Sequence, residues 1–200
     1  RRDVIVNRWK RPITSFERAI VNPGMPAFFA RNKMTFTAAP GESFEEEIRR
    51  NVEPVKDLVD LRIGDIMQAT DPGVPIEILF LDVLKLPEIS AFCFRTFFPR
   101  LVPGRSIVIQ QDYFYERLPY IKTHQEMLGE YFEYIGEVGS TAIFLCTKEV
   151  PPSALDALEA EVSAAEQLRL ASVALQRSVD PARRFLMAIS KLRLLRKLHG

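Results

Sequence analysis

The sequence predicts an α/β fold with a mostly parallel, doubly wound sheet, a closing antiparallel hairpin and a carboxy-terminal helical tail. Three observations support this prediction. Helical patterns alternate with short apolar runs typical of buried strands. Gly139-Ser140 separates two strand-like segments by two residues, which favours a hairpin. After Pro151-Pro152 the chain is rich in Ala, Leu and Glu, which are strong helix formers. We therefore expect a domain over residues 1–150 and a tail over 151–200.

The composition is that of an ordinary globular protein. The 200 residues are 47% hydrophobic and 26% charged, with a formal net charge of +1 at pH 7. No overall electrostatic field therefore favours nucleic acid or a membrane surface. No apolar run reaches the roughly 20 residues that span a bilayer, and no signal peptide is visible, so a cytoplasmic location is expected. Cys93 and Cys146 stand in apolar runs and are predicted to be buried thiols.

The first 42 residues predict a short strand followed by a long loop. Asp3-Val4-Ile5-Val6 has the apolar character of a strand. Several helix and strand breakers follow it: Pro12, Pro23, Gly24, Pro26, Pro40 and Gly41. We expect no long element in this segment.

A helix and a strand are predicted next. Ser43 and Glu46 have the spacing of a capping box, and apolar residues recur every fourth position, which predicts a helix from 43 to about 52. Glu45 and Arg49 form a supportive pair, and Pro54 ends the helix. Residues 59–63 then alternate between apolar and charged side chains, as in a half-buried strand.

Two further strands, two helices and a hairpin complete the predicted domain. Residues 76–81 are almost continuously apolar, which is typical of a parallel strand covered on both faces. A helix with a heavy apolar face follows from Pro87. Residues 106–109 form another buried strand, and a helix is expected from about 118 to 132. The hairpin strands are 134–138 and 141–147.

Acidic residues follow three of the predicted strands. Asp65, Asp82 and Asp112 each stand just after a strand. Open α/β sheets bind ligands beyond the carboxyl ends of their strands, so the three residues together indicate a site. The alternative is that aspartate simply favours loops and helix caps, and for each residue alone this alternative stays open.

These segments resemble successive motifs of class I S-adenosylmethionine-dependent methyltransferases. The matching segments are Gly64-Asp65, 77–82, 100–104 and 107–113. In that family the fourth strand ends in an acidic residue, a Leu-x-Pro-Gly turn leads into the fifth strand, and an antiparallel hairpin closes the sheet. The resemblance covers about residues 43–150 and is closest to bacterial sugar and natural-product O-methyltransferases, including macrocin O-methyltransferase-like enzymes. It implies a Rossmann-like fold and methylation of a hydroxyl on a small-molecule acceptor.

The resemblance also implies roles for individual residues. Asp65 matches the position that contacts the adenine of the cofactor, and Glu17 is the only carboxylate near the position that binds its ribose. Asp82 and Asp112 match two positions at the reacting end that bind a divalent metal in the metal-dependent members. Oxygen ligands of this kind suit Mg²⁺, which would hold the acceptor oxygen. Gln111 would add a neutral ligand where relatives carry an aspartate.

The sequence departs from the family pattern in two places. No Gly-rich turn precedes Gly24, although such a turn cradles the methionine part of the cofactor in the family. Two explanations stay open: the chain is a piece of a longer enzyme, which we favour, or it has lost the ability to bind the cofactor. A second acidic residue after the fourth strand, a candidate base in relatives, aligns with Leu84, and Lys85 stands next to it. Metal dependence and the identity of the base are therefore open.

Other residues have alternative interpretations. His124, in the helix expected at 118–132, is a candidate general base or a plain surface residue. Lys85 neutralises Asp82, serves the acceptor, or does neither. The aromatic residues 113–115 shape an acceptor pocket or contribute to packing.

The tail predicts two amphipathic helices. One runs from 153 to about 177, and the other follows the cap and first-turn proline at Asp180-Pro181 and continues to about 198. An αα-hairpin that packs on the domain or on a second subunit is expected, and the second case would make the protein a homodimer. A helix that binds an acidic partner or a membrane surface is the alternative.

Three functional hypotheses follow. The first is a methyltransferase acting on a sugar or natural product. The second is a non-catalytic methyltransferase-like scaffold that binds a protein partner through its helical tail. The third is another doubly wound enzyme, such as a nucleotide-sugar binder, because fold does not fix function.

Overall fold

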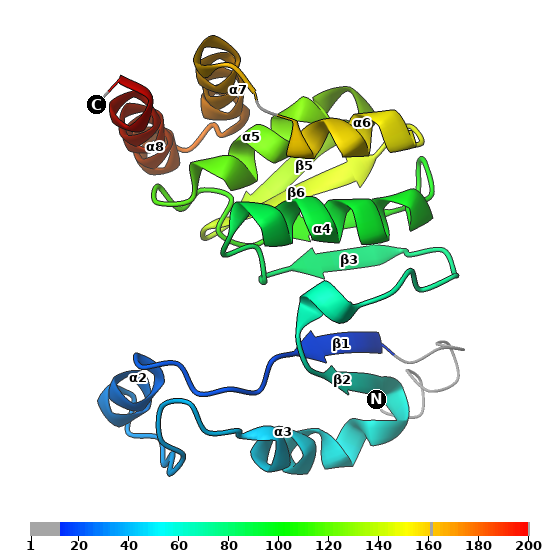
Figure 1. Cartoon of the computed structure of the whole chain (residues 1–200), viewed down its shortest axis with the longest axis vertical. Helices are drawn as coiled ribbons and strands as arrows, with labels where there is room; N and C mark the ends of the chain where they lie inside the picture. Colours follow the sequence, from blue (N-terminus) through cyan, green and yellow to red (C-terminus); the bar gives the residue numbers. More distant parts are fainter. Residues whose placement is uncertain (1–12, 161, 200) are drawn as a thin grey trace. The chain divides into compact units, whose positions relative to one another are not determined.

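The computed structural model describes residues 13–160 and 162–199. The chain divides into two compact units, residues 1–69 and 70–200 (Figure 1). The strand predicted at Asp3-Val4-Ile5-Val6 lies outside the described residues. None of the helices in the described part of the chain has the length and apolar character needed to cross a bilayer.

The smaller unit is built on two parallel strands. β1 (Ile13–Glu17) pairs in register with β2 (Val59–Ile63), and the predicted strand at 59–63 is confirmed. α2 (Met25–Arg31), α3 (Glu45–Val52) and the 3-10 helix η1 (Glu53–Leu58) connect them, and η2 (Ile66–Gln68) follows β2.

The prediction of a long loop within the first 42 residues is in part wrong, because this segment contains both β1 and α2. The polar side chains of Thr14 and Ser15 mask the strand pattern. Pro26 lies in the first turn of α2. Backbone N–H groups in a first turn make no hydrogen bond within the helix, so a proline is tolerated there.

The predicted helix at 43–52 is confirmed, but its predicted cap is wrong. The N-cap residue is Phe44, and no side chain caps the helix. The Ser43 hydroxyl instead accepts a hydrogen bond from the backbone N–H of Glu45, at 3.2 Å. The expected pair of Glu45 and Arg49 forms with an N–O distance of 2.6 Å.

The larger unit contains a mixed four-stranded sheet. Its strands are β3 (Ile78–Leu81), β4 (Ile107–Gln110), β5 (Phe132–Val138) and β6 (Thr141–Cys146), in the spatial order β3-β4-β6-β5. β3 and β4 are parallel, whereas β6 is antiparallel to both β4 and β5. The predicted closing hairpin is therefore confirmed. The parallel part of this sheet is confined to β3 and β4.

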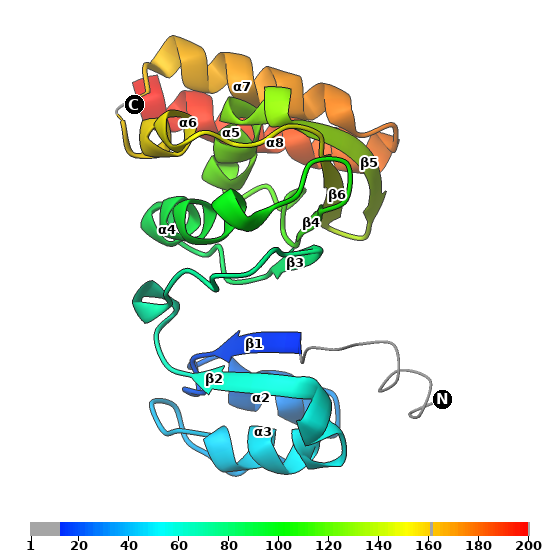
Figure 2. The same cartoon turned by 90° about the vertical axis from the view of Figure 1, so that its right-hand side faces the viewer.

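Two helices cover one face of this sheet. α4 (Pro87–Phe97) and α5 (Pro119–Met127) contact each other and lie on the same side of it (Figure 2). The paired residues Val108 and Phe144 belong to the buried face. The 3-10 helix η3 (Phe98–Arg100) follows α4. The 3-10 helix η4 (Gly129–Tyr131) follows the end of α5, so α5 is shorter than the predicted helix at 118–132. Cys93 and Cys146 are buried free thiols, as expected.

The opposite face of the sheet is apolar and partly exposed. Ile78 and Phe80 of β3 align with Ile107 and Ile109 of β4 on that face, since side chains alternate along a strand. Ile78 and Phe80 are each 56% exposed. Within the larger unit, helices α4 and α5 cover one face of this strand, and its coverage on both faces stays a prediction. A continuous apolar run reports the composition of a strand but does not show what covers it.

The tail is helical, as predicted, but its first helix is interrupted. α6 (Pro152–Asp156) and the 3-10 helix η5 (Ala157–Glu159) precede α7 (Ala164–Arg177). Ser163 starts α7 by accepting the backbone N–H of Glu166 at 3.3 Å, so the single helix expected over 153–177 is wrong. α8 (Pro181–His199) begins at the predicted cap, where Asp180 accepts the N–H of Arg183 at 2.9 Å. α7 packs on both α5 and α8, and the tail belongs to the same compact unit as the sheet.

Candidate functional site

Each strand of the two parallel pairs ends in an acidic residue or is followed by one within two residues. β1 ends in Glu17, and Asp65 is the second residue after β2. Asp82 directly follows β3, and Asp112 is the second residue after β4. Neighbouring parallel strands end at the same edge of a sheet. Glu17 and Asp65 therefore share an edge in the smaller unit, and Asp82 and Asp112 share an edge in the larger one.

Lys85 joins the two aspartates of the larger unit. Its Nζ donates to Asp82 Oδ1 at 2.8 Å and to Asp112 Oδ2 at 2.5 Å. The sequence placed Lys85 near Asp82, but its contact with Asp112 spans 27 residues and carries no local signal. Of the three interpretations of Lys85, the structure supports neutralisation, and it extends that role to both carboxylates.

The ammonium of Lys85 is the stable form in this position. Partial burial lowers its pKa, but the hydrogen bonds to Asp112 and Asp82 outweigh burial and raise the pKa above its ordinary 10.5. Lys85 is therefore a cation at neutral pH and not a general base. About half of its side-chain surface is exposed, so the group remains accessible to a ligand.

Asp112 has a strained backbone conformation. Its φ is +61°, in the left-handed region that non-glycine residues seldom adopt. The two residues that follow, Tyr113 and Phe114, are completely buried. The Tyr113 hydroxyl donates to Glu126 at 2.7 Å, and the Phe114 N–H donates to the carbonyl of Ser140 at 3.0 Å. The turn is thus fixed from inside the core, and such strain is often found at functional sites.

The loop after Asp112 is held by a buried lysine. Lys122 of α5 is 1% exposed, and its Nζ donates to the carbonyls of Tyr115 and, at 3.0 Å, Leu118. Burial lowers the Lys122 pKa to about 7, against the raising effect of Glu116 and Asp112. The structure therefore assigns Tyr113 and Phe114 to packing, and Lys122 to ordering the loop.

The carboxylates of the smaller unit are also held in place. Glu17 Oε1 accepts the N–H of Ala19 at 3.1 Å, and Asp65 Oδ1 accepts the N–H of Met67 at 3.0 Å. Each bond uses one oxygen, so each side chain keeps a second oxygen that can accept a hydrogen bond from a ligand. The predicted cofactor-binding roles of the two residues remain predictions.

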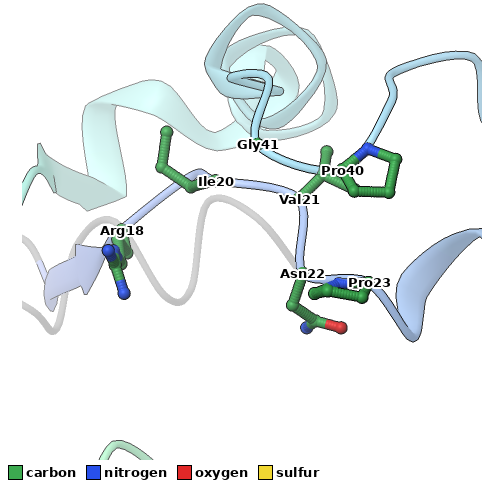
Figure 3. Close-up of a pocket in the computed structure, with 7 residues that line it drawn as sticks. All are labelled: Arg18, Ile20, Val21, Asn22, Pro23, Pro40 and Gly41. Carbon is green, nitrogen blue, oxygen red and sulfur yellow. The ribbon is translucent and has the colours of Figure 1, made fainter.

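An open depression begins one residue after Glu17. Its volume is about 450 Å³. Figure 3 shows the seven residues that line it, with the Arg18 and Asn22 side chains extending toward the same open side. The lining residues are Arg18, Ile20, Val21, Asn22, Pro23, Pro40 and Gly41. Ala19, buried and with φ of +56°, turns the chain between Glu17 and this depression.

His124 lies between α4 and α5. Its Nδ1 is 3.0 Å from the hydroxyl of Ser90, and its ring approaches those of Phe94 and Tyr120. Burial lowers its pKa to about 4, so it is neutral at pH 7. These contacts join two helices, and its predicted role as a base remains a prediction.

The predicted magnesium ligands do not fit a metal in this arrangement. One oxygen of Asp82 and one of Asp112 bind the ammonium of Lys85, so a cation already lies between the two carboxylates. Gln111 continues the strand pairing through its N–H, which donates to the Leu81 carbonyl at 3.0 Å. The residues that the structure describes contain no group of three or more His, Cys, Asp or Glu side chains placed to hold a metal ion.

The tail docks through ion pairs that the sequence analysis missed. Arg177 of α7 binds Glu126 of α5 at 2.8 Å, and the Glu126 side chain is 1% exposed. Arg183 of α8 binds Glu137 of the hairpin at 2.5 Å, and Glu137 also accepts the hydroxyl of Ser178 at 3.0 Å. The expectation that the tail packs on its own domain is confirmed.

No protein-family model and no curated protein matches the chain. Among solved structures, it is similar to the O-methyltransferase NovP, with a TM-score of 0.47 and 21% sequence identity over 71% of this chain. The chain spans 62% of the length of NovP.

Proposed function

We propose that the chain is part of an S-adenosylmethionine-dependent methyltransferase that acts on a hydroxyl of a small molecule, such as a sugar or natural product. The observation that carries the proposal is the placement of Glu17, Asp65, Asp82 and Asp112. Each lies at the end of one of the parallel strands or within two residues after it. Ligands of α/β proteins bind at such strand ends.

Glu17 and Asp65 form the cofactor-binding part of the proposal. A carboxylate accepts hydrogen bonds and cannot donate them when ionised. Glu17 would accept from the ribose hydroxyls, and Asp65 from the exocyclic amino group of adenine. Their bonds to Ala19 and Met67 fix both side chains before the ligand binds, which lowers the entropic cost of binding.

Asp82, Lys85 and Asp112 form the acceptor-binding part of the proposal. Bound S-adenosylmethionine would supply a methyl group made reactive by the sulfonium. The residues of the chain would align the acceptor hydroxyl, and a carboxylate of Asp82 or Asp112 would take its proton as the new oxygen–carbon bond forms and the sulfur–methyl bond breaks, which leaves S-adenosylhomocysteine. The ammonium of Lys85 would stabilise negative charge that develops on the acceptor oxygen.

Calorimetric titration with S-adenosylhomocysteine tests the proposal. We expect micromolar binding by the unaltered chain and at least tenfold weaker binding by Asp65→Asn and Glu17→Gln, because each substitution removes a charged acceptor. Ten-fold corresponds to about 1.4 kcal/mol.

Glu133→Gln is the matched control. Glu133 is an exposed carboxylate in β5, away from the ends of the parallel strands, and its loss should leave binding unchanged. Absence of binding by a chain with an intact thermal transition would contradict the proposal and favour the non-catalytic scaffold. Equal weakening by all three substitutions would contradict the assignment of Glu17 and Asp65.

A further inference from the structure

Two carboxylates from different strands meet at one nitrogen atom. Asp82 Oδ1 and Asp112 Oδ2 both lie within hydrogen-bonding distance of Lys85 Nζ. The strained turn at Asp112 aims its carboxylate at this point, and the buried residues Tyr113 and Phe114 hold the turn. The arrangement is therefore built by the fold and not by an isolated surface contact.

A divalent ion at this edge would need the same two carboxylates. Magnesium and manganese bind carboxylate oxygens and water, and they would compete directly with the ammonium for Asp82 and Asp112. Lys85 is tethered three residues from Asp82, so its local concentration is high compared with that of a free ion.

The other lysine near Asp112 has different partners. Lys122 is fully buried and donates to the carbonyls of Tyr115 and Leu118. Lys85 is thus the cation that the described residues place between the two aspartates.

We propose that Lys85 supplies the positive charge that a divalent metal would otherwise supply at this site, so that the site operates without a metal. This inference rests on the proposed methyltransferase function. A lysine has three N–H donors, and Asp82 and Asp112 engage two of them. The third donor would bind one acceptor oxygen.

This arrangement also restricts the class of acceptor. A six-coordinate magnesium ion can hold two neighbouring oxygens of one ligand, as in a vicinal diol. A single N–H donor holds one oxygen. The acceptor would therefore present one hydroxyl group to Lys85 and would not need a chelating pair.

Binding of Mn²⁺, followed by electron paramagnetic resonance without any cofactor, tests the inference. We expect Lys85→Ala to bind Mn²⁺ at least tenfold more tightly than the unaltered chain, because it frees two carboxylates at the end of adjacent strands. Adding Asp112→Asn to Lys85→Ala should return the affinity to that of the unaltered chain. Lys85→Gln, which keeps a long neutral side chain, provides a second variant if Lys85→Ala does not fold.

Lys148→Ala is the matched control. Lys148 is an exposed lysine whose pair with Glu130 is 3.9 Å long, and its loss should not change Mn²⁺ binding. The inference is overturned if the unaltered chain binds Mn²⁺ as tightly as the folded Lys85 variants, or if those variants gain no affinity. Because no cofactor is present, these outcomes do not depend on the result of the S-adenosylhomocysteine titration.

Discussion

The larger unit uses ion pairs in two contrasting settings. Glu126 and Arg177 pair where the carboxylate is 1% exposed, and the pair attaches the tail to α5. Asp82 and Asp112 pair with Lys85 where the lysine side chain is 51% exposed and the aspartates are 49% and 22% exposed. The bonds are of similar length, but the carboxylate of the first pair is shielded from water, whereas Lys85 is half exposed.

This difference separates a structural role from a functional one. Breaking a buried pair leaves a charge without water or partner, which costs several kcal/mol. An exposed pair contributes about 0–1 kcal/mol, because water replaces the lost partner. Lys85 can therefore exchange partners with a ligand at little cost to the fold, whereas Arg177 cannot.

Arg177→Met should give the largest loss of stability. Among the described residues it leaves buried Glu126 with Tyr113 alone as a hydrogen-bonding partner, so we expect the free energy of unfolding to fall by about 3–5 kcal/mol in urea denaturation. Arg169→Met is the control on the same helix: its pair with Glu166 is exposed, and we expect no measurable loss of stability. Similar losses for both variants would remove the contrast between the two settings.

His124 is a half-buried ionisable group, and burial is the cause of the shift in its pKa. Its pKa is lowered from 6.5 to about 4, so the unfolded chain binds the proton more readily than the folded one. The stability that this group contributes is complete above pH 6.5 and is lost as the pH falls toward 4. The loss is at most about 3 kcal/mol. His124→Asn should lose less stability than the unaltered chain over this range, as measured by urea denaturation at successive pH values. Parallel curves for the two proteins would show that His124 does not titrate in this way.

Asp112 should give the smallest effect on stability. Both Asp112→Gly and Asp112→Ala remove the carboxylate, but only glycine adopts a φ of +61° without strain. We therefore expect Asp112→Ala to be about 1 kcal/mol less stable than Asp112→Gly in urea denaturation. Equal stabilities, or a more stable alanine variant, would show that the turn relaxes and does not hold Asp112 under strain.

The elements that sequence reasoning predicted correctly have a strong local pattern. The alternation at 59–63, the apolar segments leading into Asp82 and Asp112, and the Gly139-Ser140 turn all correspond to observed elements. β1 escaped prediction because its exposed polar residues lack alternation, and α2 because a proline in a first helical turn resembles a breaker.

The site was less predictable than the strands that carry it. Asp82 and Asp112 could be placed at one edge because the carboxyl ends of parallel strands meet there. Their joint contact with Lys85 depends on the strained turn at Asp112, which no local pattern shows. The burial of Lys122 could not be predicted from the sequence either, because a lysine in an amphipathic helix is ordinarily exposed to solvent.

The docking of the tail has a consequence for synthesis of the chain. Arg177 follows Glu126 by 51 residues. At roughly 5–20 residues per second, a ribosome takes roughly 3–10 s to add these residues. During that interval α5 and the hairpin exist without the arginines that later neutralise Glu126 and Glu137. The carboxylates must stay hydrated until then, so the final packing of α5 is delayed until α7 has left the ribosome.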